Sequence, residues 1–233
     1  MSRGIQTGGG RDRWRHSALL LTLLLLFIVS PFVVTLRFGV VLLNLVGAAV
    51  LLSGTYAVSE RKRYFVATAT LAATSVILSG LILVLPGHWT VLAGHVSLML
   101  LLGLFSVSIL ASVLRAGRIT ADKIYGAICV YFLIGYAWAF GYAIIDELQP
   151  GSFSGPAETG PVDYVARVMQ MRYFSFITLT TVGFGDIVPR SQAARTFATL
   201  EAVVGQIYLA VLVARLVGLH IVHAHSSESS KEK

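Results

Sequence analysis

Six long apolar segments limit what this chain can fold into. A helix of about 20 apolar residues crosses the ~30 Å hydrocarbon core of a bilayer. Of the 233 residues, 56% are hydrophobic and only 12% are charged, which is too apolar for a soluble domain. The segments that we expect to cross the membrane are 17–36, 40–58, 64–85, 90–114, 121–145 and 193–219. The sequence therefore predicts an all-α membrane protein with six transmembrane helices and no room for a soluble ligand-binding domain.

The placement of charge predicts how these helices are oriented. The net charge is +7, but the basic residues stand between the apolar segments, which argues for topology signals and against a nucleic-acid partner. With the N-terminus inside, most arginines and lysines fall on inner segments. Both termini are therefore expected in the cytoplasm, in a multi-pass protein of the plasma membrane. The acids expected on the outer side, where they would concentrate cations, are Asp146, Glu147, Glu158, Asp163 and Asp186.

The segment between the last two apolar runs is not expected to cross the membrane. Residues 146–163 are rich in Gly, Pro, Ser and acids, which is typical of a loop. A short helix is predicted at 164–180, and it carries two arginines. The sequence Thr-Thr-Val-Gly-Phe-Gly-Asp follows at 180–186. Because irregular backbone at membrane depth is tolerated where it lines a water-filled path, we predict a re-entrant pore helix and a selectivity filter between helices five and six.

The strand Thr181–Gly185 has the residue types that selection of a dehydrated ion requires. Rings of backbone carbonyls replace the water around a potassium ion. Glycines at alternate positions, Gly183 and Gly185, tolerate positive φ and so allow consecutive carbonyls to face one axis. Val182 and Phe184 are then expected to point back into the supporting helix, and the Thr181 hydroxyl would add an innermost ligand.

This filter, its preceding helix and the last apolar segment resemble the potassium channel family over roughly residues 121–219. The resemblance implies a homotetramer, since one chain supplies one of four filter strands. It implies that K⁺, the permeant ion and no true cofactor, binds the carbonyls of Thr181, Val182, Gly183 and Phe184, with Gly185 completing the filter. Pro189 and Arg195 match positions that lead into the inner helix of simple members.

The resemblance also places a gate on the last helix. Gly205 stands where the family has a glycine hinge, although close helix packing is the alternative interpretation. The face expected to line the cavity includes Gln206, Leu209, Val213 and Val217. Of these, Val213 and Val217 are apolar and near the inner end, so they are expected to close the pore by dewetting.

Four residues are expected to support the filter: Tyr173, Thr180, Asp186 and Glu201. Tyr173 replaces a tryptophan of many members, and we expect its hydroxyl to reach Asp186. Ile177 replaces a glutamate found behind the filter in some members. Glu201 is an acid inside an apolar helix, where acids are costly and usually paired. It is expected either to brace the pore helix or hold the filter, with Arg172 as the candidate partner, or to be solvated near the outer interface.

The residues before the pore predict a domain that does not sense voltage. We expect a cytoplasmic tail at 1–16, a four-helix transmembrane domain at 17–118, a pore domain at 119–219 and a cytoplasmic tail at 220–233. Voltage sensors move several arginines through the field, but residues 89–114 contain no Arg or Lys. Arg115 and Arg118 are interpreted as inner-face anchors, and little voltage dependence is predicted.

Other functions remain as alternatives at this point. The same scaffold could form a non-selective cation channel, a subunit of a potassium transporter, or a non-conducting regulatory subunit. The intact filter favours potassium conduction over each of these. The sequence has no motif of an enzyme, and it indicates no gating stimulus. The tail contains His220, His223 and His225, interpreted either as a solvated tail or as a sensor of inner pH.

Overall fold

The computed structural model describes residues 15–33, 39–58, 62–85, 87–115, 120–155 and 164–229, with side chains of the last helix placed up to Arg215. Long apolar runs without internal breakers form helices, and the described part is almost entirely helical. The helices are α1 (Arg15–Val33), α2 (Gly39–Val58), α3 (Lys62–Val84), α4 (His88–Val113), α5 (Ala121–Leu148), α6 (Tyr164–Leu179) and α7 (Gln192–Ser229). Two short strands, β1 (Phe153–Ser154) and β2 (Val188–Pro189), flank α6.

Four segments are long and apolar enough to cross a bilayer, and they make this a multi-pass membrane protein. They are Phe65–Ile82, His88–Val113, Ala121–Leu148 and Gln192–Arg215. The apolar parts of α1 and α2 are shorter, at His16–Phe32 and Leu45–Val58. The expected all-α class is thus found, whereas a count of six spans stays a prediction.

The helix ends lie within a few residues of the predicted ones, with one clear exception. The last helix was expected to end at 219, but α7 continues to Ser229. Residues 220–229 contain no Gly or Pro, so no residue in this stretch breaks the helical backbone. The expected tail at 220–233 therefore begins as helix, and residues 1–14 and 230–233 of the two expected tails lie outside the described residues.

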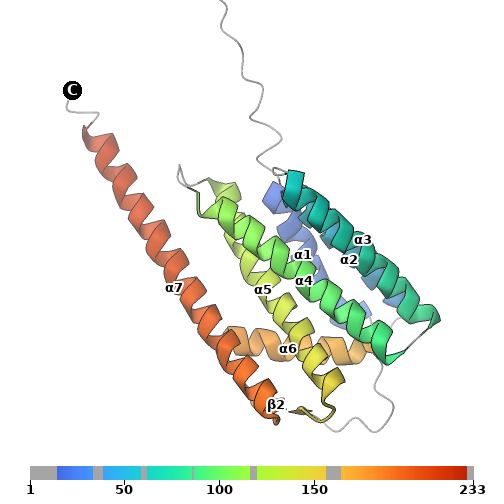
Figure 1. The fold of residues 1–233 in the computed structure, drawn as a ribbon. Helices are drawn as coiled ribbons and strands as arrows, with labels where there is room; N and C mark the ends of the chain where they lie inside the picture. The colour runs from blue at the N-terminus through green and yellow to red at the C-terminus, as the bar shows by residue number, and fades with distance from the viewer. Residues whose placement is uncertain are drawn as a thin grey trace, which may run out of the picture.

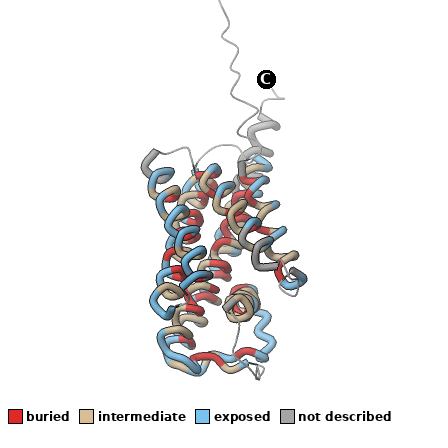
Figure 2. The backbone as a smooth tube through the Cα atoms, turned by 90° about the vertical axis from the view of Figure 1, so that its right-hand side faces the viewer, coloured by how far each residue is buried: buried red, intermediate tan, exposed pale blue. Residues whose placement is uncertain are grey.

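Helices α1 to α5 pack side by side in one bundle (Figure 1). Buried positions lie on the faces that these helices turn toward one another (Figure 2). Hydroxyl pairs connect neighbours inside the bundle: Thr22 Oγ1 lies 3.0 Å from Ser53 Oγ, and Ser75 Oγ lies 2.6 Å from Ser97 Oγ. Helices α1 and α4 therefore pack directly on α5 of the same chain, and α2 and α3 pack on α1 and α4.

Helix α6 crosses the bundle direction between α5 and α7, whereas α7 leans away from the other helices (Figure 1). The segments on either side of α6 are joined by an antiparallel pairing of β1 with β2, which places Phe153 opposite Pro189. The amide of Arg190 donates to the carbonyl oxygen of Ser152 at 2.7 Å. These bonds hold residues 152–154, which follow α5, beside residues 188–190, which precede α7. The C-terminal end of α5 and the N-terminal end of α7 are therefore fixed relative to each other.

Candidate ion-conduction site

The strand that follows α6 has an alternating backbone conformation. Thr181, Gly183 and Gly185 have positive φ angles of 59°, 53° and 81°. In an ordinary strand successive carbonyls point to opposite sides, and a left-handed residue at every second position turns them toward the same side. Thr181 adopts this conformation without being glycine, which costs roughly 1–2 kcal/mol. The predicted glycine pattern is therefore part of a longer alternation that begins two residues before Gly183, at Thr181.

The base of this strand is tied to the C-terminal end of α6. The amides of Val182 and Gly183 both donate to the carbonyl oxygen of Ile177, at 2.9 and 3.1 Å. The amide of Thr181 donates to Thr178 O at 3.0 Å, and the Thr180 hydroxyl donates to Phe176 O at 2.6 Å. The last carbonyls of a helix have no partner within the helix, so the strand satisfies them. Thr180 is thus bonded to α6 at the base of the strand, and its role in supporting a filter stays a prediction.

The side chains of the strand are open in the single chain. Val182 is 53% exposed and Phe184 is 71% exposed in the single chain, so the expectation that they pack back into the supporting helix stays a prediction. A Cβ built at Gly183 or Gly185 would meet no atom within 4 Å. The strand is attached at its N-terminal end to the C-terminal end of α6. No part of the described chain covers its side chains.

Glu201 is fully buried between α5, α6 and α7. Its Oε2 accepts a hydrogen bond from the Tyr142 hydroxyl, and its Oε1 lies 2.5 Å from Ser175 Oγ. Ser175 Oγ also lies 2.7 Å from the carbonyl oxygen of Gly135, which can only accept. A hydroxyl has one proton, so Ser175 donates to Gly135 and needs a donor from the other side. The three contacts are all satisfied when Glu201 is a neutral acid that donates from Oε1 to Ser175.

Both sequence-based interpretations of Glu201 need correction. The acid is not solvated, because its side chain has no exposed surface. It does brace the pore helix, but through Ser175 and not through Arg172. Arg172 donates instead to Ser30 Oγ at 2.5 Å, and its guanidinium lies 5.6 Å from the centre of the Phe27 ring. The side chain of Arg172 therefore reaches α1.

Tyr173 and Asp186 are brought together as expected. Hydrogen bonding with the Asp186 carboxylate raises the pKa of the Tyr173 hydroxyl above its usual range. Asp186 also accepts from the amide of Ile187 at 3.1 Å. The carboxylate that follows the filter is therefore held by its own loop and by α6, although its effect on conduction stays a prediction.

Gly205 lies where α7 passes the end of α6. A Cβ at this position would lie 2.5 Å from the carbonyl oxygen of Leu179 and 2.9 Å from its Cδ1. This close approach supports the packing interpretation of Gly205. Because α7 is one continuous helix from Gln192 to Ser229, a hinge at this glycine stays a prediction.

The expected gate residues follow Gly205 along α7. Gln206, Leu209 and Val213 are exposed in the single chain, and their spacing puts them on one side of the helix. The side chains of Val217, His220, His223 and His225 lie outside the described residues. The constriction at Val213 and Val217 therefore stays a prediction.

The segment that leads into α7 is held by its own side chains. Arg195 Nε donates to the carbonyl oxygen of Pro189 at 3.2 Å, and the Ser191 hydroxyl accepts from the amide of Ala194 at 3.2 Å. Pro189 and Arg195, which the resemblance singled out, are thus in contact. Sequence analysis did not identify Tyr142 and Ser175 as the partners of Glu201. The one sequence signal of each is a hydroxyl group among apolar neighbours.

The comparisons with known proteins concern the same region. A family model described as "Ion channel" matches residues 136–219. Two pore potassium channel c of Oryza sativa subsp. japonica is 35% identical over 86 residues, which are 37% of this chain and 17% of that protein. Two pore potassium channel a of the same organism is 32% identical over 87 residues, 37% of this chain and 21% of that protein.

A bacterial protein also matches. Protein LctB of Bacillus caldotenax is 29% identical over 100 residues, 43% of this chain and 74% of LctB. No solved structure matches the chain significantly. The matched region spans about a fifth of the length of the two rice proteins. Residues 136–219 of the chain therefore match the ion channel family model and are similar in sequence to potassium channels.

Proposed function

We propose that four copies of this chain form a potassium-selective channel in the plasma membrane. The observation that carries the proposal is the alternation of positive φ at Thr181, Gly183 and Gly185. Four such strands around one axis would present rings of carbonyls from Thr181, Val182, Gly183 and Phe184 to a dehydrated K⁺ ion. The open sides of the strand support an assembly, since a ring needs neighbours that one chain lacks.

In this proposal α1 to α5 and α7 all cross the membrane, and α6 is the re-entrant pore helix. Both termini lie in the cytoplasm, as the distribution of basic residues favours. Helix α7 lines the inner cavity with Gln206, Leu209 and Val213. Helix α4 contains no Arg or Lys, so conduction is expected to depend little on voltage.

Reversal potentials of the purified protein in planar bilayers test this function. With K⁺ on one side and Na⁺ on the other, the reversal potential should follow the K⁺ gradient, and the current should change smoothly with voltage. Gly183→Ala is the matched variant, because φ of 53° is strained for alanine and the change adds one methyl group. We expect this variant to lose selectivity or current.

Two results would contradict the proposal. A reversal potential that follows Na⁺ as closely as K⁺ would indicate a non-selective cation channel. Folded protein that carries no current in any lipid, with Gly183→Ala indistinguishable from the original chain, would indicate a non-conducting membrane subunit.

A further inference from the structure

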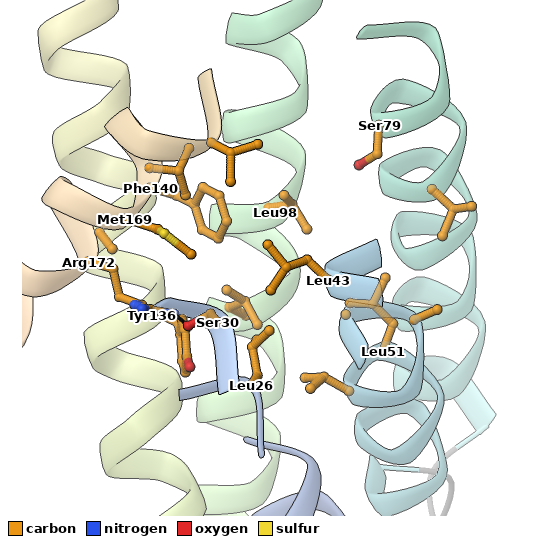
Figure 3. Close-up of a pocket in the computed structure, with 18 of the residues that line it drawn as sticks. Leu26, Ser30, Leu43, Leu51, Ser79, Leu98, Tyr136, Phe140, Met169 and Arg172 are labelled. Carbon is orange, nitrogen blue, oxygen red and sulfur yellow. Dashed lines mark hydrogen bonds between the residues drawn. The ribbon is translucent and has the colours of Figure 1, made fainter. Parts of the chain in front are cut away.

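A cavity of about 470 Å³ lies inside the bundle, next to the pore helix. All of the helices α1 to α6 contribute to its wall (Figure 3). Most of the wall is apolar, including Leu26, Leu51 and Leu98. This volume is in the range of sites that hold small ligands. The α3 side includes Val76, which is 53% exposed, so the cavity is open between helices that face lipid.

Arg172 is the one charged residue among those that line the cavity. Its guanidinium points from α6 toward Ser30 and Tyr136 (Figure 3). The ion pairs of the described residues are His16–Asp122, His88–Glu147 and Arg167–Asp146, so in this part of the chain no acid neutralises Arg172. A charge in apolar surroundings is costly without a counter-ion. An anion that enters the cavity would supply one.

We propose that this cavity binds a long-chain fatty acid from the bilayer, with its carboxylate on Arg172 and its chain among the leucines of α1, α2 and α4. A guanidinium has five N–H donors and matches a carboxylate with two parallel bonds. A phospholipid is a poorer fit, because the interface holds its headgroup and it carries a second chain. The ligand would contact Met169 and Arg172 of α6, which continues into the filter.

Binding to the purified full chain tests this site without any need for ion flux, so its result is independent of the proposed conduction. Native mass spectrometry of delipidated protein would measure the affinity for oleate and for oleyl alcohol, which has the same chain and no charge. We expect oleate to bind at least about tenfold more tightly, as hydrogen bonds to a charged group allow. Arg172→Gln should abolish that preference, and Arg172→Lys should keep part of it.

Two further variants make the test specific. Arg167→Gln removes a neighbouring charge of α6 that does not line the cavity, and it should leave the preference unchanged. Gly47→Leu should weaken both ligands at least about tenfold by filling the cavity, and an added Cβ at Gly47 meets no atom within 4 Å. If Arg172→Gln fails to fold, two measurements still test the proposal. They are the relative affinity of the original chain for oleate and oleyl alcohol, and the loss of binding in Gly47→Leu.

Several outcomes would overturn the proposal. Equal affinity for oleate and oleyl alcohol would remove the role of the charge. An equal loss of preference in Arg167→Gln would indicate non-specific attraction. Binding that Gly47→Leu leaves unchanged would place the ligand elsewhere, and a retained phospholipid that Gly47→Leu releases would replace the fatty acid as the occupant.

Discussion

At the scale of single residues, the buried acid of α7 links three helices by hydrogen bonds. Glu201 contacts Tyr142 of α5 and Ser175 of α6, and Ser175 continues to the carbonyl of Gly135. Ile177 occupies the position where some members of the potassium channel family carry an acid behind the filter. The carboxyl group behind the pore helix of this chain therefore comes from α7.

The proton count around Glu201 predicts that glutamine can replace it. Glu201→Gln keeps a donor toward Ser175 and an acceptor for Tyr142, so we expect a loss of less than about 1 kcal/mol in unfolding free energy. Glu201→Ala removes the partner of the buried Tyr142 hydroxyl, leaves Ser175 with Gly135 alone and opens a cavity, and it should cost about 3 kcal/mol or more. Thermal unfolding in detergent measures both. A Gln variant as unstable as the Ala variant would show that the acid acts as a carboxylate.

At the scale of elements, the contact between α6 and α7 depends on the absence of a side chain. The carbonyl oxygen of Leu179 lies where a Cβ of residue 205 would be. The same helix end carries the bonds that hold the filter strand. A displacement of α7 at this point would therefore reach the filter through the last turn of α6.

Gly205→Ala should destabilise the protein by about 1–3 kcal/mol, because the added methyl group overpacks against backbone. Gly103→Ala in α4 is the matched control, since its Cβ meets no atom within 4 Å and alanine favours a helix by up to about 1 kcal/mol. Unfolding in detergent compares the two. Should both variants be equally stable, the close contact would be unimportant and the hinge interpretation of Gly205 would gain weight.

At the scale of the whole molecule, the single chain leaves apolar surface of α7 uncovered. The described part of α7 carries large exposed apolar side chains, among them Val203, Ile207 and Val211. The filter strand is open on its sides as well. The bundle of α1 to α5, by contrast, is packed within the chain.

We expect the purified protein to be a tetramer. Native mass spectrometry in a mild detergent should show the mass of four chains, and a denaturing detergent should return the mass of one. Crosslinking in native membranes provides an independent count, with bands that end at four. Crosslinked bands that extend only to the mass of two chains would contradict a ring of four identical filter strands.

Much of the pore region could be predicted from the sequence, because it depends on neighbours along the chain. Apolar length set the helix ends to within a few residues, and Gly183 and Gly185 indicated the left-handed positions of the filter. The conformation of Thr181 and the extension of α7 to Ser229 could not be predicted in this way. Thr181 is not glycine, and α7 continues beyond its apolar run into polar residues, where apolar length does not mark the helix end.

The sequence by itself determined the class of protein, the left-handed positions at Gly183 and Gly185, and the presence of a costly acid and arginine in apolar surroundings. Only the tertiary structure decided their partners: Glu201 meets Tyr142 and Ser175, whereas Arg172 faces a cavity and reaches Ser30. The physical reason is that apolar runs define the length of helices but leave their rotation and relative depth open. Those two quantities are settled when the helices pack, and they determine which distant side chains touch.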